Sequence, residues 1–181
     1  MSKENYPKNN LSQLFKTFPV PFDLRETKNN YTVFTREHSK SSNEKIINQA
    51  IQFQLQGNIL EASKYYQYCL NHDCNDPRVF SNYGLILKDH GNLIEAEILT
   101  RKAISLNPTN SNAHLNLGII LKDLGKSNEA EISTRKAIDL KPDFAEAHCN
   151  MGIILKDLGK LNEAEISTRK AIDFSPNLAE A

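Results

Sequence analysis

The sequence predicts an all-α fold in which helical hairpins stack into a solenoid, preceded by a polar arm. Two observations carry this prediction. Residues 111–144 and 145–178 agree at about 25 of 34 positions, and a period of this length is the signature of a repeat architecture. Residues 77–110 form a third copy and residues 43–76 a degenerate fourth, so the predicted repeat domain spans residues 43–178.

Each copy contains two runs of apolar residues at helical spacing. In residues 111–144 the first run comprises Leu115, Leu117, Ile120, Leu121 and Leu124, and the second comprises Ala130, Ile132, Ala137, Ile138 and Leu140. Each copy is therefore predicted to be two helices. Because a two-helix unit cannot bury its apolar face alone, we expect the copies to stack.

Turn residues separate the two helices of a copy and end the second one. A glycine follows the first run, where a helix ends readily in a left-handed residue: Gly91, Gly125 and Gly159. Asn128 and Asn162 are the expected N-caps of the second helices. Prolines close the second helices: Pro108, Pro142 and Pro176.

Small residues recur where paired helices must approach closely. They are Gly84, Gly118 and Gly152 in the first helices, with Ala96, Ala130, Ala164, Ala103, Ala137 and Ala171 in the second. At these residues the chain resembles the tetratricopeptide repeat (TPR) family, which has Gly at repeat position 8, Ala at positions 20 and 27 and Pro at position 32. The resemblance covers residues 43–181 and implies a right-handed superhelical solenoid.

One departure from the TPR pattern concerns the second helix. Position 24 is usually large in the family, but Thr100, Thr134 and Thr168 stand there, and Ile98, Ile132 and Ile166 occupy position 22, which is usually polar. Two arrangements are open: a rotated second helix that buries these isoleucines, or an exposed apolar row. We favour burial, because exposed rows of this kind are uncommon on soluble monomers.

Residues 1–42 are predicted to be a separate, largely disordered arm, rich in Asn, Lys, Ser and Thr and interrupted by prolines. Within it lies one apolar cluster, from Phe15 to Leu24. Two roles are open for this cluster: it shields the open end of the first repeat, or it is a docking peptide for a partner or for the chain's own groove. At the other end, residues 179–181 repeat the opening of a copy, which predicts the start of a truncated fifth repeat in a fragment.

Charge and hydropathy exclude several classes of partner. The arm carries seven basic and four acidic side chains, which leaves residues 43–181 with a net charge of −3. Neither part is basic enough to predict a nucleic-acid partner. No apolar run approaches the roughly 18 residues that span a bilayer, and no secretory signal is evident, so no membrane association is expected and the predicted location is the cytoplasm.

Few residues suggest catalysis or metal binding. Cys69, His72 and Cys74 form a C-x-x-H-x-C cluster, but Cys69 replaces a core alanine and no second ligand pair follows, so no metal and no cofactor are predicted. His114 and His148 stand where the TPR pattern has a packing aromatic. No phosphate-binding loop or nucleophile motif is present, so these residues are not predicted to be an enzyme.

The candidate binding residues lie on the first helices, whose positions 2, 5, 6, 9, 12 and 13 line the concave side in the TPR family. Position 6 is asparagine in all four copies: Asn48, Asn82, Asn116 and Asn150. A row of amides can bond the N–H and C=O groups of an extended peptide regardless of its side chains. The alternative is that these are solvated residues of the repeat pattern. Beside them lie Leu85, Ile119 and Ile153, and the rim carries Lys88, Lys122 and Lys156.

Three functions follow from this surface. The first is a non-catalytic scaffold that binds an extended peptide of a protein partner. The second is the substrate-recognition arm of a larger transferase, because the asparagine-bearing repeats are similar to those of O-linked N-acetylglucosamine transferases, and similar repeats precede sulfotransferase and methyltransferase domains. The third is weak self-association through uncapped solenoid ends.

Overall fold

The computed structural model describes residues 40–176, which form α-helices connected by short turns, with no strand in this range. The helices are α2 (Lys40–Leu55), α3 (Ile59–Asn71), α4 (Pro77–Asp89), α5 (Leu93–Leu106), α6 (Ser111–Asp123), α7 (Ser127–Leu140), α8 (Ala145–Asp157) and α9 (Leu161–Phe174). None of these helices combines the length and the apolar character needed to cross a bilayer.

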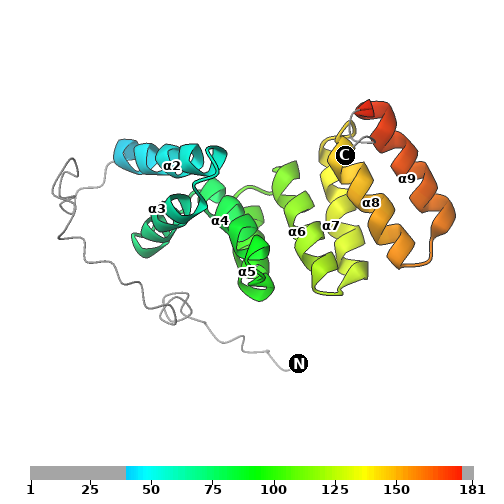
Figure 1. The fold of residues 1–181 in the computed structure, drawn as a ribbon, viewed down its shortest axis with the longest axis horizontal. Coiled ribbons are helices and arrows are strands. Elements are labelled where there is room, and N and C mark those ends of the chain that lie inside the picture. The colour runs from blue at the N-terminus through cyan, green and yellow to red at the C-terminus, as the bar shows by residue number, and fades with distance from the viewer. Residues whose placement is uncertain (1–39, 177–181) are drawn as a thin grey trace, which may run out of the picture. The chain divides into compact units, whose positions relative to one another are not determined.

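The helices pack as successive hairpins, as the period predicts (Figure 1). Helix α4 packs on α5, α6 on α7, and α8 on α9. Neighbouring hairpins meet through α3 and α4, α5 and α6, and α7 and α8, while the first helices α4, α6 and α8 also touch in sequence. From Asn43 onward the described helices belong to one compact unit, and the predicted all-α solenoid of TPR hairpins is confirmed.

Two predictions fall largely outside the described residues. Helix α2 begins at Lys40, so the last residues assigned to the arm are helical. The rest of the arm, with the apolar cluster Phe15 to Leu24, and residues 179–181 of the predicted fifth repeat lie outside residues 40–176.

The turns inside the hairpins use glycine as predicted. Gly91 and Gly125 have φ angles of 79° and 75°, in the left-handed region that glycine adopts without steric cost. The predicted N-caps are wrong, since α7 and α9 take Lys126 and Lys160 as N-caps and Asn128 lies within the first turn of α7. The helix starts earlier because it resumes directly after the glycine, with the Ala130 amide bonded to the Lys126 carbonyl at 3.0 Å.

Paired helices approach closely through a glycine and a threonine. A Cβ atom built on Gly118 would lie 2.2 Å from Thr134 Oγ1, and one on Gly84 would lie 2.7 Å from Thr100 Oγ1. Thr134 and Thr100 are fully buried. Because glycine at repeat position 8 has no side chain, the threonine packs directly against its backbone. This contact sets the distance between the two helices of a hairpin.

The same close approach corrects the prediction for repeat position 22. Ile98, Ile132 and Ile166 are 37%, 71% and 56% exposed, so their predicted burial is wrong. The second helix is not rotated, because threonine at position 24 fills the narrow space beside the glycine. In the first hairpin, Ala50 replaces the glycine, and Tyr66 at position 24 is fully buried.

Candidate functional site

The asparagines predicted to bind a peptide lie on the first helix of each hairpin. Asn82, Asn116 and Asn150 belong to α4, α6 and α8, which touch one another in that order. Asn48 lies on α2. Three of the four amides therefore lie on first helices that touch one another.

Two of these amides are held by a hydrogen bond within the chain. Asn82 donates through Nδ2 to the hydroxyl of Tyr66 at 3.1 Å, and Asn116 donates through Nδ2 to Oγ of Ser81 at 3.3 Å. An amide NH₂ has two N–H groups and the amide oxygen has two lone pairs, so each bond uses only one of the four hydrogen bonds that the side chain can make. The bond fixes the orientation of the amide and leaves an N–H and the oxygen for a ligand.

Exposure of the amides changes along the stack. Asn48 is exposed, Asn82 and Asn116 are half-buried, and Asn150 is only 9% exposed. Glu44, on the same helix as Asn48, has a pKa that is lowered mainly by its hydrogen bond with Arg78. The middle pair, Asn82 and Asn116, thus combines a fixed orientation with partial accessibility.

The apolar and charged neighbours of the row have unequal exposure. Leu85 and Ile119 are half-buried, and Ile119 packs against the cluster around Leu115, whereas Ile153 is 44% exposed. Lys88 pairs with Asp89 at 2.8 Å and Lys122 with Asp123 at 3.1 Å. The lysines on α4 and α6 therefore form local ion pairs with the next residue, while Lys156 on α8 is exposed.

The residues of the C-x-x-H-x-C cluster, Cys69, His72 and Cys74, make packing contacts within the fold. Cys69 and Cys74 are buried, and burial raises the pKa of the Cys69 thiol to about 12, which keeps it protonated. The His72 ring stacks on Tyr68 with centroids 3.9 Å apart. Among the described residues, no group of three or more His, Cys, Asp or Glu side chains is arranged to hold a metal ion.

His114 and His148 connect the first helices α6 and α8 to the turns before them. Nε2 of His114 lies 2.9 Å from the carbonyl oxygen of Pro108, and Nε2 of His148 lies 2.8 Å from that of Pro142. A carbonyl only accepts hydrogen bonds, so Nε2 is the protonated nitrogen in both rings. The ring also packs, since His148 stacks on Phe174 at 5.5 Å. These histidines therefore stabilise the turn between successive hairpins by a hydrogen bond to its proline carbonyl.

Sequence reasoning missed the polar contacts between hairpins. Glu97 accepts hydrogen bonds from Arg101 of its own helix at 2.9 Å and from Lys126 of the next hairpin at 2.8 Å. Glu131 repeats this arrangement with Arg135 and Lys160. The pairs four residues apart were visible in the sequence, and the recurrence of Lys at repeat position 16 was the signal for the second bond.

A hollow of about 800 Å³ is lined by residues of the second helices α5 and α7, together with His114 and Leu117 of α6. It includes the exposed Ile132, with Arg101 and Lys136 among its charged residues. None of the predicted peptide-binding residues lines it. The hollow is therefore the alternative place at which a ligand would bind these hairpins.

Known structures share the fold. The crystal structure of MamA has a TM-score of 0.67 at 20% identity, covering 77% of this chain and 81% of that chain. MamA from Desulfovibrio magneticus RS-1 has a TM-score of 0.65 at 22% identity, covering 74% and 76%. YrrB, described as a TPR protein with an unusual peptide-binding site, has a TM-score of 0.65 at 20% identity, covering 75% and 70%.

The sequence itself places the chain in a family. No curated protein matches it. Residues 48–172, which include parts or all of the helices from α2 to α9, match the family of a TPR-like domain. The repeat period, the hairpin geometry and this match agree, and the chain belongs to the family of the Cilia and flagella-associated protein 70 middle TPR-like domain.

Proposed function

We propose that this protein is a non-catalytic scaffold that holds an extended peptide segment of a partner protein along its first helices. The carrying observation is the pair Asn82 and Asn116, each oriented by one intrachain hydrogen bond and each left with an N–H and a C=O group. Such groups can pair with the backbone of an extended chain without reading its side chains. The similarity of the fold to YrrB, a TPR protein with an unusual peptide-binding site, supports peptide binding by such a fold.

We expect the other predicted binding residues to form the apolar and charged edges of this site. Leu85 and Ile119 supply half-buried apolar contact beside the amides, and Ile153 adds a more exposed contact on α8. The ion pairs of Lys88 and Lys122 with their neighbouring aspartates make the rim close to neutral. The site therefore suits a peptide selected by extended shape more than by charge.

We place this scaffold in the cytoplasm, as the sequence predicts. Its described cysteines, Cys69, Cys74 and Cys149, are all free, which is typical of a reducing compartment. The alternative role as the recognition arm of a transferase rests on the resemblance of the asparagine row, and no described residue adds an observation in its favour.

The test uses peptides of about 12 residues selected for binding to the whole chain from a random library. For a selected peptide, we expect the double variant Asn82→Ala/Asn116→Ala to weaken binding at least tenfold, which corresponds to about 1.4 kcal/mol. Asn128→Ala is the matched control, because Asn128 is an exposed asparagine that lines the hollow on α7. Methylating the backbone nitrogens of the peptide should also weaken binding, since the bonds go to its backbone.

Circular dichroism would establish that the double variant is folded at the temperature of the assay, because each alanine also removes an intrachain hydrogen bond, worth about 1 kcal/mol. Unchanged affinity of the folded double variant would contradict the proposal. Loss of affinity in Asn128→Ala or Ile132→Ala instead would place the peptide in the hollow between α5 and α7.

A further inference from the structure

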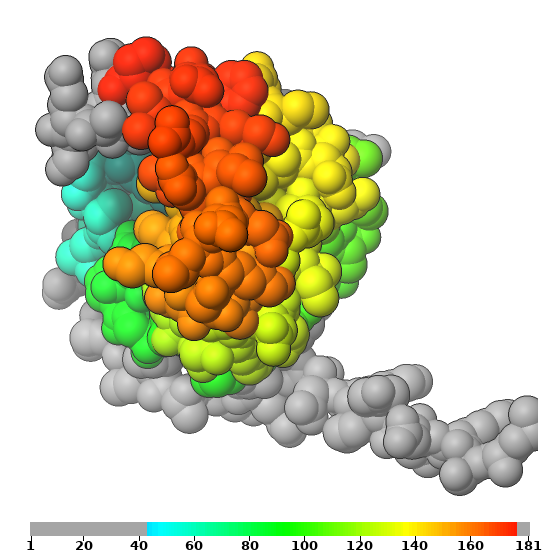
Figure 2. Space-filling model, turned by 90° about the vertical axis from the view of Figure 1, so that its right-hand side faces the viewer, coloured from blue at the N-terminus to red at the C-terminus, as the bar shows by residue number. Residues whose placement is uncertain are grey.

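The second helices carry an apolar row that the proposed peptide site does not use. Ile98, Ile132 and Ile166 stand at the same repeat position on α5, α7 and α9, and Ile132 is 71% exposed. Helix α7 packs against both α6 and α8, so the following hairpin is already in place and leaves Ile132 uncovered. In Figure 2 the yellow segment that includes α7 lies at the surface beside α8, in orange. Exposed apolar side chains that recur in this way indicate an interaction surface.

The hollow lined by α5, α6 and α7 adjoins this row. Ile132 is one of its lining residues, and Ile104 and Leu117 contribute further apolar side chains. Its volume of about 800 Å³ is well above the roughly 150 Å³ of a cavity left by removing one large apolar side chain. The row therefore has room beside it for an apolar side chain that comes from another chain.

Two charged residues flank Ile132 and have no ion pair among residues 40–176. They are Lys136 and Asp139, which are both exposed. The arginines of the hollow differ, because Arg101 and Arg135 each pair with a glutamate of their own helix. Lys136 lies four residues and Asp139 seven residues after Ile132, so at about 100° per residue they project to opposite sides of it. The face thus has an apolar centre with a free base on one side and a free acid on the other.

We propose that this face, defined by Ile132, Lys136 and Asp139 of α7, binds the same face of a second copy of this chain. A two-fold axis along α7 packs Ile132 on Ile132 of the second copy and brings Lys136 of each chain beside Asp139 of the other. Such an interface is self-complementary, because each copy supplies both the acid and the base that the other needs. The same rotation brings α5 of one copy opposite α9 of the other, so that Ile98 faces Ile166.

The area of this face is sufficient for a weak, specific dimer. Helices α5, α7 and α9 have 14 residues each. A helix of that length is about 21 Å long and about 10 Å wide, so three of them present roughly 600 Å². Two copies would bury about 1,200 Å² in total, which is at the lower end of the range for specific interfaces. We therefore expect a dimer that dissociates on dilution.

The test measures the mass of the whole chain by sedimentation equilibrium between about 1 μM and about 1 mM. We expect a reversible dimer, and Ile132→Asp should raise its dissociation constant at least tenfold. Lys136→Glu and Asp139→Lys should each do the same, because every dimer then contains two pairs of like charges. An equal mixture of these two variants should dimerise again, since opposite charges meet at both places of the mixed dimer.

Asp157→Lys is the matched control, because Asp157 is an exposed aspartate of the first helix α8 and gives the same change of charge away from the second helices. This variant should dimerise as the unchanged chain does. The face contains none of the asparagines of the proposed peptide site, so the two proposals are tested independently.

Circular dichroism would establish that the variants are folded. A chain that stays monomeric at every concentration would overturn the proposal and leave the face to a different protein or to residues 1–39. A dimer that Ile132→Asp does not weaken would also overturn it, and would place the contact elsewhere, such as at the ends of the stack. So would an equal mixture of Lys136→Glu and Asp139→Lys that stays as weakly associated as either variant alone.

Discussion

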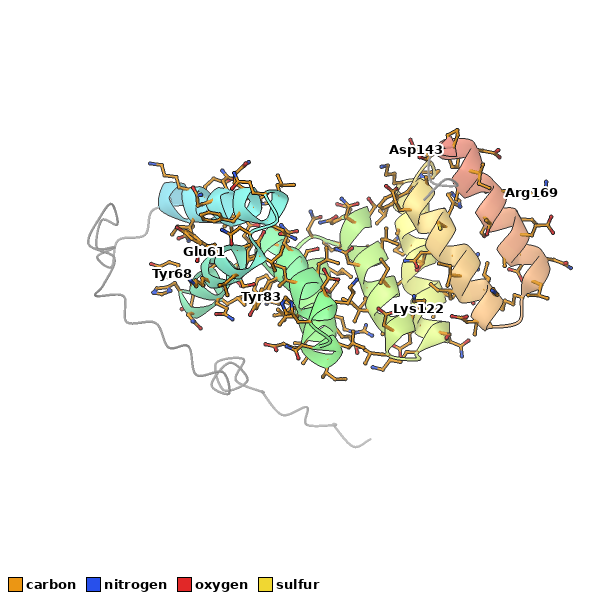
Figure 3. All side chains as sticks on the ribbon, viewed as in Figure 1. Glu61, Tyr68, Tyr83, Lys122, Asp143 and Arg169 are labelled. Carbon is orange, nitrogen blue, oxygen red and sulfur yellow. The ribbon has the colours of Figure 1, made fainter. Side chains whose placement is uncertain are left out.

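The first junction between hairpins, α3 with α4, is built differently from the later ones. Tyr66 is fully buried there, donates its hydroxyl to Gln54 Oε1 at 2.8 Å and accepts from Asn82. Gln67 donates to the hydroxyl of Tyr83, which Figure 3 places on α4 facing α3. Aromatic rings and their hydroxyl groups thus supply both the apolar and the polar contacts of this junction.

The later hairpins use a glycine–threonine contact inside each hairpin, and ion pairs provide the polar contacts between hairpins. Threonine takes the place of Tyr66, and glycine opposite it lets the two helices of the hairpin close up. The polar contact moves to the outside, where Glu97 and Glu131 each bind a lysine of the following hairpin. The comparison teaches that the space between the helices of a hairpin is filled either by a large buried ring or by a threonine packed against a glycine, and that the two solutions differ in how much each side chain contributes.

The largest expected effect is at the aromatic junction. Tyr66→Ala removes a fully buried ring and two hydrogen bonds, and should lower the free energy of unfolding by about 3–5 kcal/mol. Tyr66→Phe keeps the ring and should cost only about 1 kcal/mol. Urea unfolding measures both. Equal costs for the two variants would show that the hydroxyl bonds, rather than the ring, hold this junction.

The close glycine contact should give the next largest effect. Gly118→Ala places a Cβ atom 2.2 Å from Thr134 Oγ1, and should lower the free energy of unfolding by about 1–3 kcal/mol. Thr134→Ala in the same chain removes the clashing atom and should recover most of that loss. A double-mutant cycle of the two positions measures their coupling. A cycle with no coupling would mean that the two helices do not meet through this pair.

A smaller effect, of opposite sign, is expected at the buried threonines. The hydroxyls of Thr100 and Thr134 are buried with no hydrogen-bond partner. Thr134→Val replaces a hydroxyl with a methyl group of similar size and should raise the free energy of unfolding by about 1 kcal/mol. Thr168→Val is the matched control, because the Thr168 hydroxyl donates to the Ala164 carbonyl at 2.9 Å and should show no gain. Destabilisation by Thr134→Val would contradict this account.

The smallest effect concerns the pH dependence of the ion pairs. Burial raises the pKa of Glu97, but hydrogen bonds from Lys126 and Arg101 outweigh it and lower the pKa. The hydrogen bond from Lys160 is the main cause of the lowered pKa of Glu131. Since the folded pKa lies below the unfolded value of about 4.3, the stability from each pair is complete above that pH and is lost as the pH falls through the folded pKa.

Glu97→Gln and Glu131→Gln should therefore flatten the decrease in stability on acidification, by less than about 1 kcal/mol each. Thermal unfolding between neutral and acidic pH measures the change. Glu165→Gln is the comparison, because Glu165 pairs only within its own helix and is largely exposed. A steeper acid dependence in the two internal variants would reverse the assigned direction.

The period alone was sufficient to predict the hairpins, their number of helices and their stacking, because each copy contains the same apolar spacing and the same glycine. Residues whose role depends on a distance between helices could not be predicted that way. The sequence predicts that Ile132 is buried, but the structure buries Thr134 against Gly118 and leaves Ile132 exposed. The close approach of the two helices at Gly118, which decides this, is not visible in the apolar spacing. The sequence placed the asparagines on neighbouring helices, but the bonds of Asn82 and Asn116 depend on residues of the preceding hairpin.

The central proposal concerns the side-chain amides of Asn82 and Asn116, and their nuclear magnetic resonance signals test it most directly. Titrating a selected peptide into the whole chain should shift the side-chain NH₂ resonances of these two residues, while those of Asn128 and Asn162 stay in place. The account predicts that both shifts saturate with the same dissociation constant as binding. Saturable binding that moves the Asn128 signal and leaves Asn82 and Asn116 unchanged would contradict it.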